Sequence, residues 1–387
     1  MSRLFYCFVF ISFLFYTCVV KAEIPIIAFP GVPAEESTEY RFREFKKAGF
    51  DVSISNFEDK PTSQFIQALD KAHACGVRLM ALSAELWNQP VPTVNKIKNH
   101  PALFGYFLRD EPSTTDEINA TSTLYRKISS VDKTKPFYMC MIPCYGQMSK
   151  REYEGYVNKL VKIGVPQICF DYYPITESGL RPLWFYNLEF VRKQSLRTKR
   201  PFWGYVLSTA HADYPIPTLG MLRLQVYANL MYGAQAILYF TYWTPHADEN
   251  FHFRYGPIAS DGTKTTTYDT VSLMNRELRN IRQLFDGATV RHLGHLVKIP
   301  EGARKFSLSG SGLKRIVASG RKGILVSRFS SSRGNYIAFL NKDYENEAEI
   351  QIVALGKVNR ITKDLKSEPL QSHYRLSPGN ILILQIH

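Results

Sequence analysis

Residues 102–113 read ALFGYFLRDEPS, an apolar and aromatic run that ends in two carboxylates and a proline. An ionised carboxylate is strongly disfavoured inside an apolar strand unless it has a partner. Asp110 and Glu111 therefore indicate either a solvated turn or a functional site at the end of a buried strand. Pro112 has no backbone N–H to donate, so it is expected to end the strand and turn the chain away.

Similar apolar runs recur along the chain and can be compared by position. There are eight, at residues 24–30, 50–56, 77–85, 102–111, 136–143, 166–174, 201–209 and 236–243. The intervening stretches place apolar residues at helical spacing and finish near a glycine, as in 38–49, 62–76, 150–164 and 222–235. Apolar strands that alternate with amphipathic helices predict a parallel sheet covered on both faces. Eight such units predict a (β/α)8 TIM barrel over residues 23–288. A doubly wound open sheet is the alternative, but no glycine-rich phosphate loop follows the first run.

The composition changes after a last helical stretch at residues 270–285. Short alternating runs follow at 323–330, 336–342, 348–355 and 380–387, separated by Gly, Ser and Asn. This pattern predicts a C-terminal all-β sandwich over residues 289–387. The chain has a formal net charge of +14, and the C-terminal quarter carries much of the basic excess. We expect this module either to bind an acidic polymer or to present a basic, soluble surface.

Residues 1–22 have the features of a secretory signal peptide. They contain an early arginine, a long apolar stretch and a small residue, Ala22, at the end. Cleavage near Ala22 would give a secreted or periplasmic protein. A membrane anchor is one alternative, although the stretch is only marginally long enough to span a bilayer. Lipidation at Cys18 is another, and for a cleaved protein membrane contact is expected only with that modification. Nucleic acid is not an expected partner, because no binding motif for it is present.

The predicted barrel indicates where the two carboxylates of the fourth run lie. Active sites of (β/α)8 barrels lie at the C-terminal ends of the strands, which places Asp110 and Glu111 at the mouth. A glutamate that closes the fourth strand, follows a polar residue and precedes proline resembles the Asn-Glu-Pro motif of clan A (β/α)8 glycoside hydrolases, including β-galactosidase-like families. The resemblance implies an oligo- or polysaccharide substrate and Glu111 as the general acid/base. It places Asp110 where those enzymes carry the asparagine that holds the sugar 2-hydroxyl.

Glycoside hydrolysis usually needs a second carboxylate, which the clan places at the end of the seventh strand. The seventh run and the loop after it contain His211 but no glutamate. Asp171, which ends the sixth run, is the preferred partner as base or nucleophile, and Glu85 in the third run is an alternative. The adjacent Asp110 and Glu111 also resemble the pair of substrate-assisted hexosaminidases. A barrel that binds glycans without cleaving them is the competing class of protein.

Each carboxylate also has a structural interpretation. Asp110 could pair with Arg109 or cap the helix that begins near Thr114. Glu111 could be a solvated turn residue, and Asp171 could serve only as a hydrogen-bonding group. For Glu85, a structural or substrate-binding role is favoured over catalysis.

Aromatic residues near the ends of the runs are candidates for stacking on sugar rings. Tyr172 and Trp243 are the favoured positions at the mouth. Many aromatic residues will instead belong to the core, because alternate strand positions point inward or toward the helices. The predicted substrate-binding set is Glu85, Trp87, Tyr172, Tyr173, His211, Tyr242 and Trp243. No HExxH, paired histidines at helical spacing or Asp-rich calcium loop occurs, so no metal or other cofactor is expected.

Overall fold

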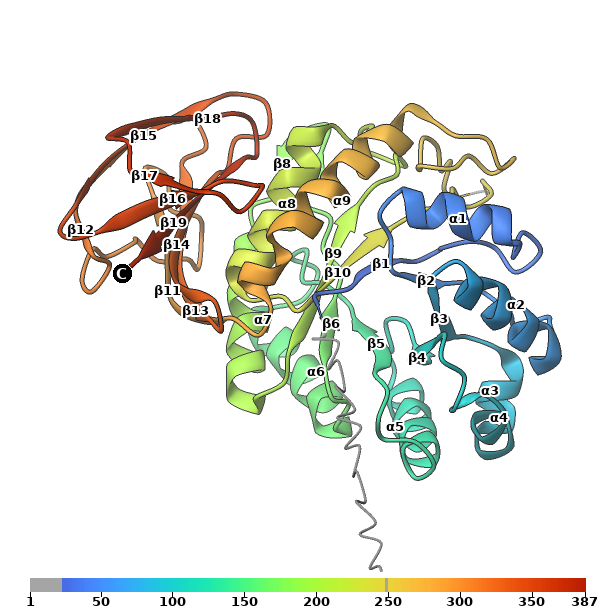
Figure 1. The fold of residues 1–387 in the computed structure, drawn as a ribbon. Helices are drawn as coiled ribbons and strands as arrows, with labels where there is room; N and C mark the ends of the chain where they lie inside the picture. Colours follow the sequence, from blue (N-terminus) through green and yellow to red (C-terminus); the bar gives the residue numbers. More distant parts are fainter. Residues whose placement is uncertain (1–22, 248–249) are drawn as a thin grey trace, which may run out of the picture.

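The computed structural model describes residues 23–247 and 250–387. Its N-terminal part is a closed barrel of eight parallel strands in the order β1-β10-β9-β6-β5-β4-β3-β2 (Figure 1). The barrel strands are β1 (Ile26–Ala28), β2 (Val52–Ile54), β3 (Arg78–Ala81), β4 (Leu103–Arg109), β5 (Phe137–Met141), β6 (Ile168–Phe170), β9 (Phe202–Leu207) and β10 (Ala236–Phe240). Each strand falls within one of the eight apolar runs, so the predicted (β/α)8 barrel is confirmed. The predicted signal peptide, residues 1–22, lies outside the described residues.

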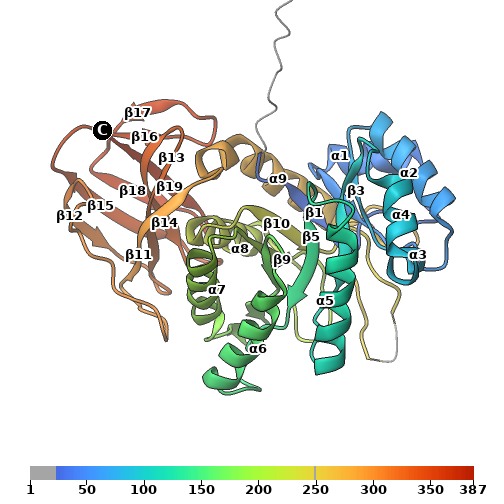
Figure 2. The ribbon, with the colours of Figure 1, turned by 90° about the horizontal axis from the view of Figure 1, so that it is seen from below.

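Helices surround the barrel, as the two views in Figures 1 and 2 show. Two of the helices begin with a capping box, in which two residues exchange side chain–backbone hydrogen bonds. The pairs are Thr114 with Glu117 and Ser149 with Glu152. The helices are α1 (Glu39–Lys47), α2 (Thr62–Ala74), α3 (Ala84–Asn88), α4 (Pro90–Ile97), α5 (Thr115–Ser129), α6 (Lys150–Ile163), α7 (Trp184–Thr198), α8 (Leu219–Tyr232) and α9 (Thr266–Phe285). A short hairpin of β7 (Ile175–Thr176) and β8 (Gly179–Leu180) lies between β6 and α7. Within the described residues, no helix has the length and apolar character needed to span a membrane.

Strand β4 carries an irregularity that affects its C-terminal end. Phe107 is paired with Tyr138 of β5, but the next paired residue is Arg109, opposite Met139. The extra residue on β4 shifts the inward and outward alternation of the strand, as β-bulges do. The backbone N–H of Glu111 then donates to the carbonyl of Cys140 at 3.1 Å. The bulge therefore sets how the two carboxylates that follow β4 are presented.

The C-terminal part consists of two antiparallel sheets, which confirms the predicted β-sandwich. Figure 1 shows it on one side of the barrel, next to α7, α8 and α9. One sheet has the order β11-β13-β14-β19-β16-β17, and the other has the order β12-β15-β18. The strands are β11 (Thr289–Leu296), β12 (Leu313–Ala318), β13 (Ile324–Ser331), β14 (Gly334–Asn341), β15 (Ala348–Ala354), β16 (Val358–Ile361), β17 (Ser367–Pro369), β18 (His373–Leu376) and β19 (Ile381–Ile386). Their inner faces share one apolar core.

Barrel and sandwich meet through close backbone and ring contacts. Phe285 at the end of α9 stacks on Phe329 of β13, with ring centroids 4.5 Å apart. The hydroxyl of Ser327 donates to the carbonyl of Met231 in α8 at 2.8 Å. Gly220 of α8 lies so close to the sandwich that a Cβ atom there would be 2.2 Å from the backbone oxygen of Tyr344. This helical glycine is therefore required by packing between the two parts.

Two glycine-to-alanine substitutions in helices test this packing. Gly220→Ala should destabilise the protein by about 1–3 kcal/mol, the usual cost of overpacking a tight contact. Gly155 of α6 is the matched control, because a Cβ there meets nothing within 4 Å. Gly155→Ala should raise the free energy of unfolding by about 0.5–1 kcal/mol, since alanine is the better helix former. Denaturant unfolding measures both values, and equal effects of the two substitutions would contradict the close approach.

Candidate active site

The candidate site begins where β4 ends at the mouth of the barrel. Glu111 leaves the strand with a φ of +45°, in the left-handed region that residues other than glycine seldom adopt. Such a conformation costs about 1–3 kcal/mol and persists only where the surrounding structure imposes it. Here the hydrogen bond to Cys140 and the following proline fix the backbone on both sides of the residue. Strained residues of this kind cluster at functional sites.

Asp110 is held by a pair of tyrosines that rise from the barrel interior. The hydroxyl of Tyr138 on β5 donates to Asp110 Oδ1 at 2.8 Å, and the hydroxyls of Tyr138 and Tyr205 are 2.7 Å apart. The Asp110 side chain is open to water, but nearby protein atoms weaken its hydration and raise its pKa to about 6. The hydrogen bond from Tyr138 opposes this rise, and the charge of Glu111 adds to it.

The structural roles suggested for Asp110 belong to other residues. Arg109 forms its ion pair with Glu117 at 3.3 Å. The hydroxyl of Thr114 accepts from the backbone N–H of Glu117 and caps α5. Neither contact involves Asp110. Its hydrogen bond with Tyr138 therefore serves neither helix capping nor a surface ion pair.

Asp171 brings a third carboxyl to the same place. It follows β6, two residues after Cys169, and faces the interior as Cys169 does. Its carboxyl interacts with that of Glu111 closely enough to affect the pKa of both groups, and its Oδ1 atom is buried without a hydrogen-bond partner among the described residues. Burial raises the pKa of Asp171 well above its usual range, and the charges of Glu111 and Asp110 raise it further. Glu111 is exposed, but nearby protein atoms weaken its hydration and raise its pKa, and its interaction with Asp171 opposes this rise.

No cation compensates these carboxyls. Among the described residues, no lysine, arginine or histidine forms an ion pair with Asp110, Glu111 or Asp171, and none is a leading cause of their pKa shifts. No cluster of three or more His, Cys, Asp or Glu suited to a metal ion occurs within residues 23–247 and 250–387. Two carboxyls in contact cannot both be ionised without a large repulsion. The charge of Glu111 therefore favours the protonated form of Asp171.

Several of the predicted sugar-binding residues lie near this cluster of three carboxyls. Trp87 donates its ring N–H to the carbonyl of Phe107 at 3.2 Å, which fixes the indole beside β4. Tyr173 packs on the barrel interior, 6.4 Å from the ring of Tyr205. His211 is buried among aromatic rings, 4.8 Å from Tyr214, and burial lowers its pKa. It is therefore neutral at physiological pH.

Three other predicted contacts are not at the mouth, and for these residues the structure corrects the prediction. Tyr242 is fully buried against Phe45 and Phe50, between the strands and α1. Trp243 is also buried and lies under the guanidinium of Arg41. Tyr172 packs in the outer layer, since it follows the inward-facing Asp171 by one position.

Glu85 has a structural partner and does not belong to the cluster of three carboxyls. It accepts hydrogen bonds from the backbone N–H and the hydroxyl of Thr62, at the start of α2. These hydrogen bonds lower the pKa of Glu85. The alternative in which Glu85 acts as the second catalytic carboxylate is therefore not supported by its contacts.

Tyr138 and Tyr205 were not identified from the sequence. Tyr138 lies two positions before Cys140 in the fifth apolar run, so strand alternation places both on one face. Which face that is depends on the closed barrel. The hydrogen bond from Tyr138 to Asp110 also depends on the bulge in β4, which no sequence pattern predicted.

Solved structures with this architecture include glycoside hydrolases. The β-galactosidase from Bacillus circulans sp. alkalophilus has a TM-score of 0.63 at 8% identity, over 94% of this chain and 99% of that one. The α-amylase from H. orenii has a TM-score of 0.54 at 9% identity, over 95% of this chain and 100% of that one. The β-galactosidase from Marinomonas ef1 has a TM-score of 0.52 at 9% identity, over 67% of this chain and 60% of that one.

At these identities the comparisons establish the fold. They confirm the barrel with a C-terminal sandwich that the resemblance to clan A glycoside hydrolases implied. A β-galactosidase and an α-amylase both match, so the fold does not select the bond that is cleaved. No protein-family model matches the chain, and no curated protein matches its sequence.

The raised pKa of Asp110 predicts a pH-dependent stability. A carboxyl whose pKa is higher in the folded protein stabilises the fold below about pH 4, and this stabilisation is lost as the pH rises through about 6. Asp110→Asn keeps an acceptor for Tyr138 and removes the charge. Its melting temperature should exceed that of the wild type at pH 7.5, and the difference should vanish at pH 4.

Asp59 provides the contrasting control for this titration. It is exposed, and a hydrogen bond from Lys60 lowers its pKa. Asp59→Asn should therefore be slightly less stable than the wild type above about pH 4, which is the opposite sign to Asp110→Asn. Thermal unfolding across the pH range measures both variants. A constant difference between Asp110→Asn and the wild type from pH 4 to 7.5 would contradict the assignment.

Proposed function

We propose that this protein is an exported glycoside hydrolase that cleaves an O-glycosidic bond of an oligo- or polysaccharide. The observation that carries the proposal is that Glu111 and Asp171 follow β4 and β6 at the C-terminal end of the barrel and that their carboxyls interact. The fold shared with known glycosidases supports it. The apolar leader at residues 1–22 supports export.

In this proposal, Glu111 is the general acid and Asp171 is the nucleophile. The two carboxyls hold one proton between them, and in the free protein the more buried Asp171 keeps it and donates to Glu111. Transfer of that proton across the hydrogen bond gives a protonated Glu111 and an ionised Asp171. This state has the same total charge as the resting one and is the form that protonates a leaving oxygen and attacks the anomeric carbon.

The contact between the carboxyls favours retention of anomeric configuration. Inverting glycosidases keep their carboxyls about 6.5–9.5 Å apart to hold a water between them, and retaining ones keep them about 5–5.5 Å apart. An interaction between the two carboxyls fits the shorter, retaining separation better than the longer one that holds a water. Attack by Asp171 would form a covalent glycosyl ester, and Glu111 would then activate the water that releases the sugar.

Asp110 supports a second candidate reaction on the same site. Tyr138 fixes its carboxyl beside Glu111, where it could orient a 2-acetamido group. Cleavage would then proceed by substrate assistance, with Glu111 still the acid. Turnover restricted to N-acetylhexosaminides and insensitive to Asp171→Asn would favour this reaction over the first.

Substitution of Glu111 tests the proposed activity. Glu111→Gln should lower kcat by about 10²–10⁴-fold on whichever glycoside a substrate panel identifies, because the amide cannot donate the required proton. Substrate affinity should be retained. Glu58→Gln is the matched control, since Glu58 is an exposed carboxylate in the loop after β2. A wild-type protein that binds glycans but turns over none of them would favour the non-catalytic class.

A further inference from the structure

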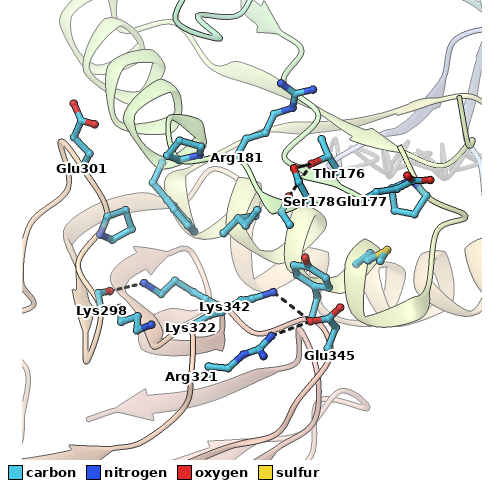
Figure 3. Close-up of a pocket in the computed structure, with 18 of the residues that line it drawn as sticks. Thr176, Glu177, Ser178, Arg181, Lys298, Glu301, Arg321, Lys322, Lys342 and Glu345 are labelled. Atoms are coloured by element: carbon cyan, nitrogen blue, oxygen red, sulfur yellow. Dashed lines mark hydrogen bonds and ion pairs between the residues drawn. The ribbon is translucent and has the colours of Figure 1, made fainter. Parts of the chain in front are cut away.

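A large cavity lies between the β7–β8 hairpin and the sandwich (Figure 3). Its volume is about 710 Å³, within the range of about 300–1,000 Å³ that small-molecule sites occupy. Five cationic and three acidic side chains line it, so its net charge is positive. None of the carboxyls of the candidate active site is among its lining residues.

Lys342 is the unusual member of this lining. It follows β14 and is 2% exposed, and its Nζ atom donates to the carbonyl of Lys298 at 2.6 Å (Figure 3). The same atom is 3.2 Å from Nδ1 of His295, whose Nε2 atom is 3.2 Å from the hydroxyl of Tyr232. An ammonium has three N–H donors, so two of them are engaged by neutral acceptors and one is left for a ligand.

No carboxylate compensates Lys342. Burial and, to a smaller extent, the nearby Lys298 lower its pKa to about 7, and no acidic group among the described residues opposes them. His295 cannot supply a negative charge, and burial lowers its pKa so that it stays neutral. A buried, unpaired charge is costly, and proteins keep such groups where a ligand or a reaction uses them.

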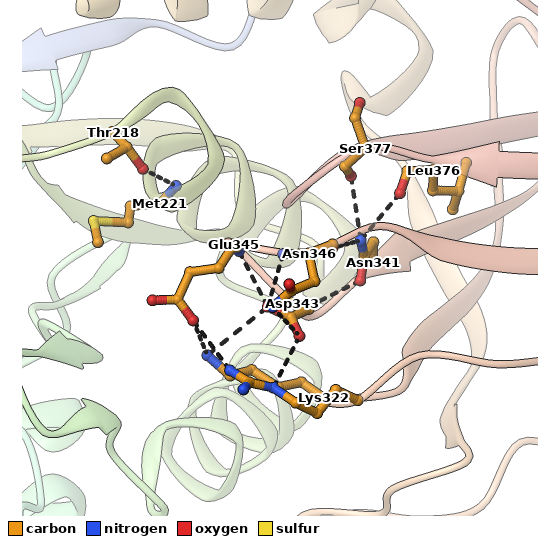
Figure 4. Close-up of polar contacts among 10 residues, drawn as sticks. Thr218, Met221, Lys322, Asn341, Asp343, Glu345, Asn346, Leu376 and Ser377 are labelled. Atoms are coloured by element: carbon orange, nitrogen blue, oxygen red, sulfur yellow. Dashed lines mark hydrogen bonds and ion pairs between the residues drawn. The ribbon is translucent and has the colours of Figure 1, made fainter.

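Two neighbouring cations, Arg321 and Lys322, differ from Lys342 because they are already paired. Asp343 is fully buried, and its Oδ1 atom accepts from the backbone N–H groups of Glu345 and Asn346, which fixes the loop after β14 (Figure 4). Arg321 pairs with Asp343 at 3.5 Å and with Glu345 at 3.2 Å. Lys322 pairs with Glu345 at 3.5 Å and lies 3.6 Å above the ring of Tyr344.

Apolar side chains form much of the remaining wall. Leu180, Pro182 and Phe185 contribute from the barrel side, and Ile299 and Pro300 contribute from the sandwich. A small inorganic anion would leave these surfaces without contact. A ligand with a ring-sized body and one negative group matches both the apolar wall and the uncompensated ammonium.

We propose that this cavity binds an acidic saccharide through a carboxylate that pairs with Lys342. The charge of the ligand compensates the buried ammonium, and the apolar faces of its sugar rings pack against the wall. The saccharide class rests on the proposed glycosidase function, whereas the anionic character rests on Lys342 alone. The cavity would hold acidic glycans next to the catalytic barrel and would give the basic sandwich a defined role.

Binding of digalacturonate, compared with its dimethyl ester, tests the proposal on the full chain. Isothermal titration calorimetry with the Glu111→Gln protein excludes turnover during the measurement. The acid should bind at least tenfold more tightly than the ester. Lys342→Met should remove this preference by lowering affinity for the acid at least tenfold. The variant should remain folded, since methionine replaces a buried charge with an apolar chain of similar length.

Two further variants keep the test decisive. Lys314→Met removes an exposed cation of β12 in the same module and should leave affinity unchanged. Lys298→Met removes the exposed cation that lines the cavity, so a loss of affinity there supports the site even if Lys342→Met does not fold. Equal affinity for acid and ester, unchanged binding by Lys342→Met, or equally tight binding of sulfate would overturn the proposal. Because these readouts do not involve turnover, failure of the cavity proposal is distinguishable from failure of the glycosidase proposal.

Discussion

The site depends on one electrostatic constraint, which is that the barrel mouth holds three carboxyls without a cation. The surrounding protein weakens the hydration of Asp110, Glu111 and Asp171 and raises the pKa of each, and the charge of Glu111 raises the pKa values of both aspartates further. Full ionisation would be strongly unfavourable, so the group retains a proton at a pH where isolated carboxyls have none. A retained proton next to an ionised carboxylate is what acid-assisted cleavage of a glycosidic bond requires.

The scaffold imposes this constraint through ordinary strand geometry. Alternation along β6 turns Asp171 inward, and the bulge in β4 places Asp110 and Glu111 at the same end of the barrel. Tyr138 and Tyr205 fill the space below and fix Asp110. The strained backbone of Glu111 fits this interpretation, because surrounding contacts hold a residue that would otherwise relax.

Strand and helix patterns were sufficient to predict the barrel, because each βα unit carries its own apolar run and amphipathic stretch. The position of Glu111 at the end of the fourth run followed from the same pattern. Side-chain direction was not predictable for Tyr172, Tyr242 and Trp243, which face the helix layer instead of the mouth. A bulge or a shifted register changes direction without a local sequence signal, and the role of Glu85 at the start of α2 depends on a contact 23 residues away.

The most direct measurement is a ¹³C NMR titration of the carboxyl carbons in protein labelled at aspartate and glutamate, with Asp171→Asn and Glu111→Gln for assignment. The account predicts that, at pH 7, the Asp171 carboxyl is still protonated while Glu111 is ionised, and that Glu111→Gln lowers the pKa of Asp171. If both carboxyls are fully ionised at pH 7 and titrate with ordinary pKa values, the shared proton does not exist and the account is contradicted.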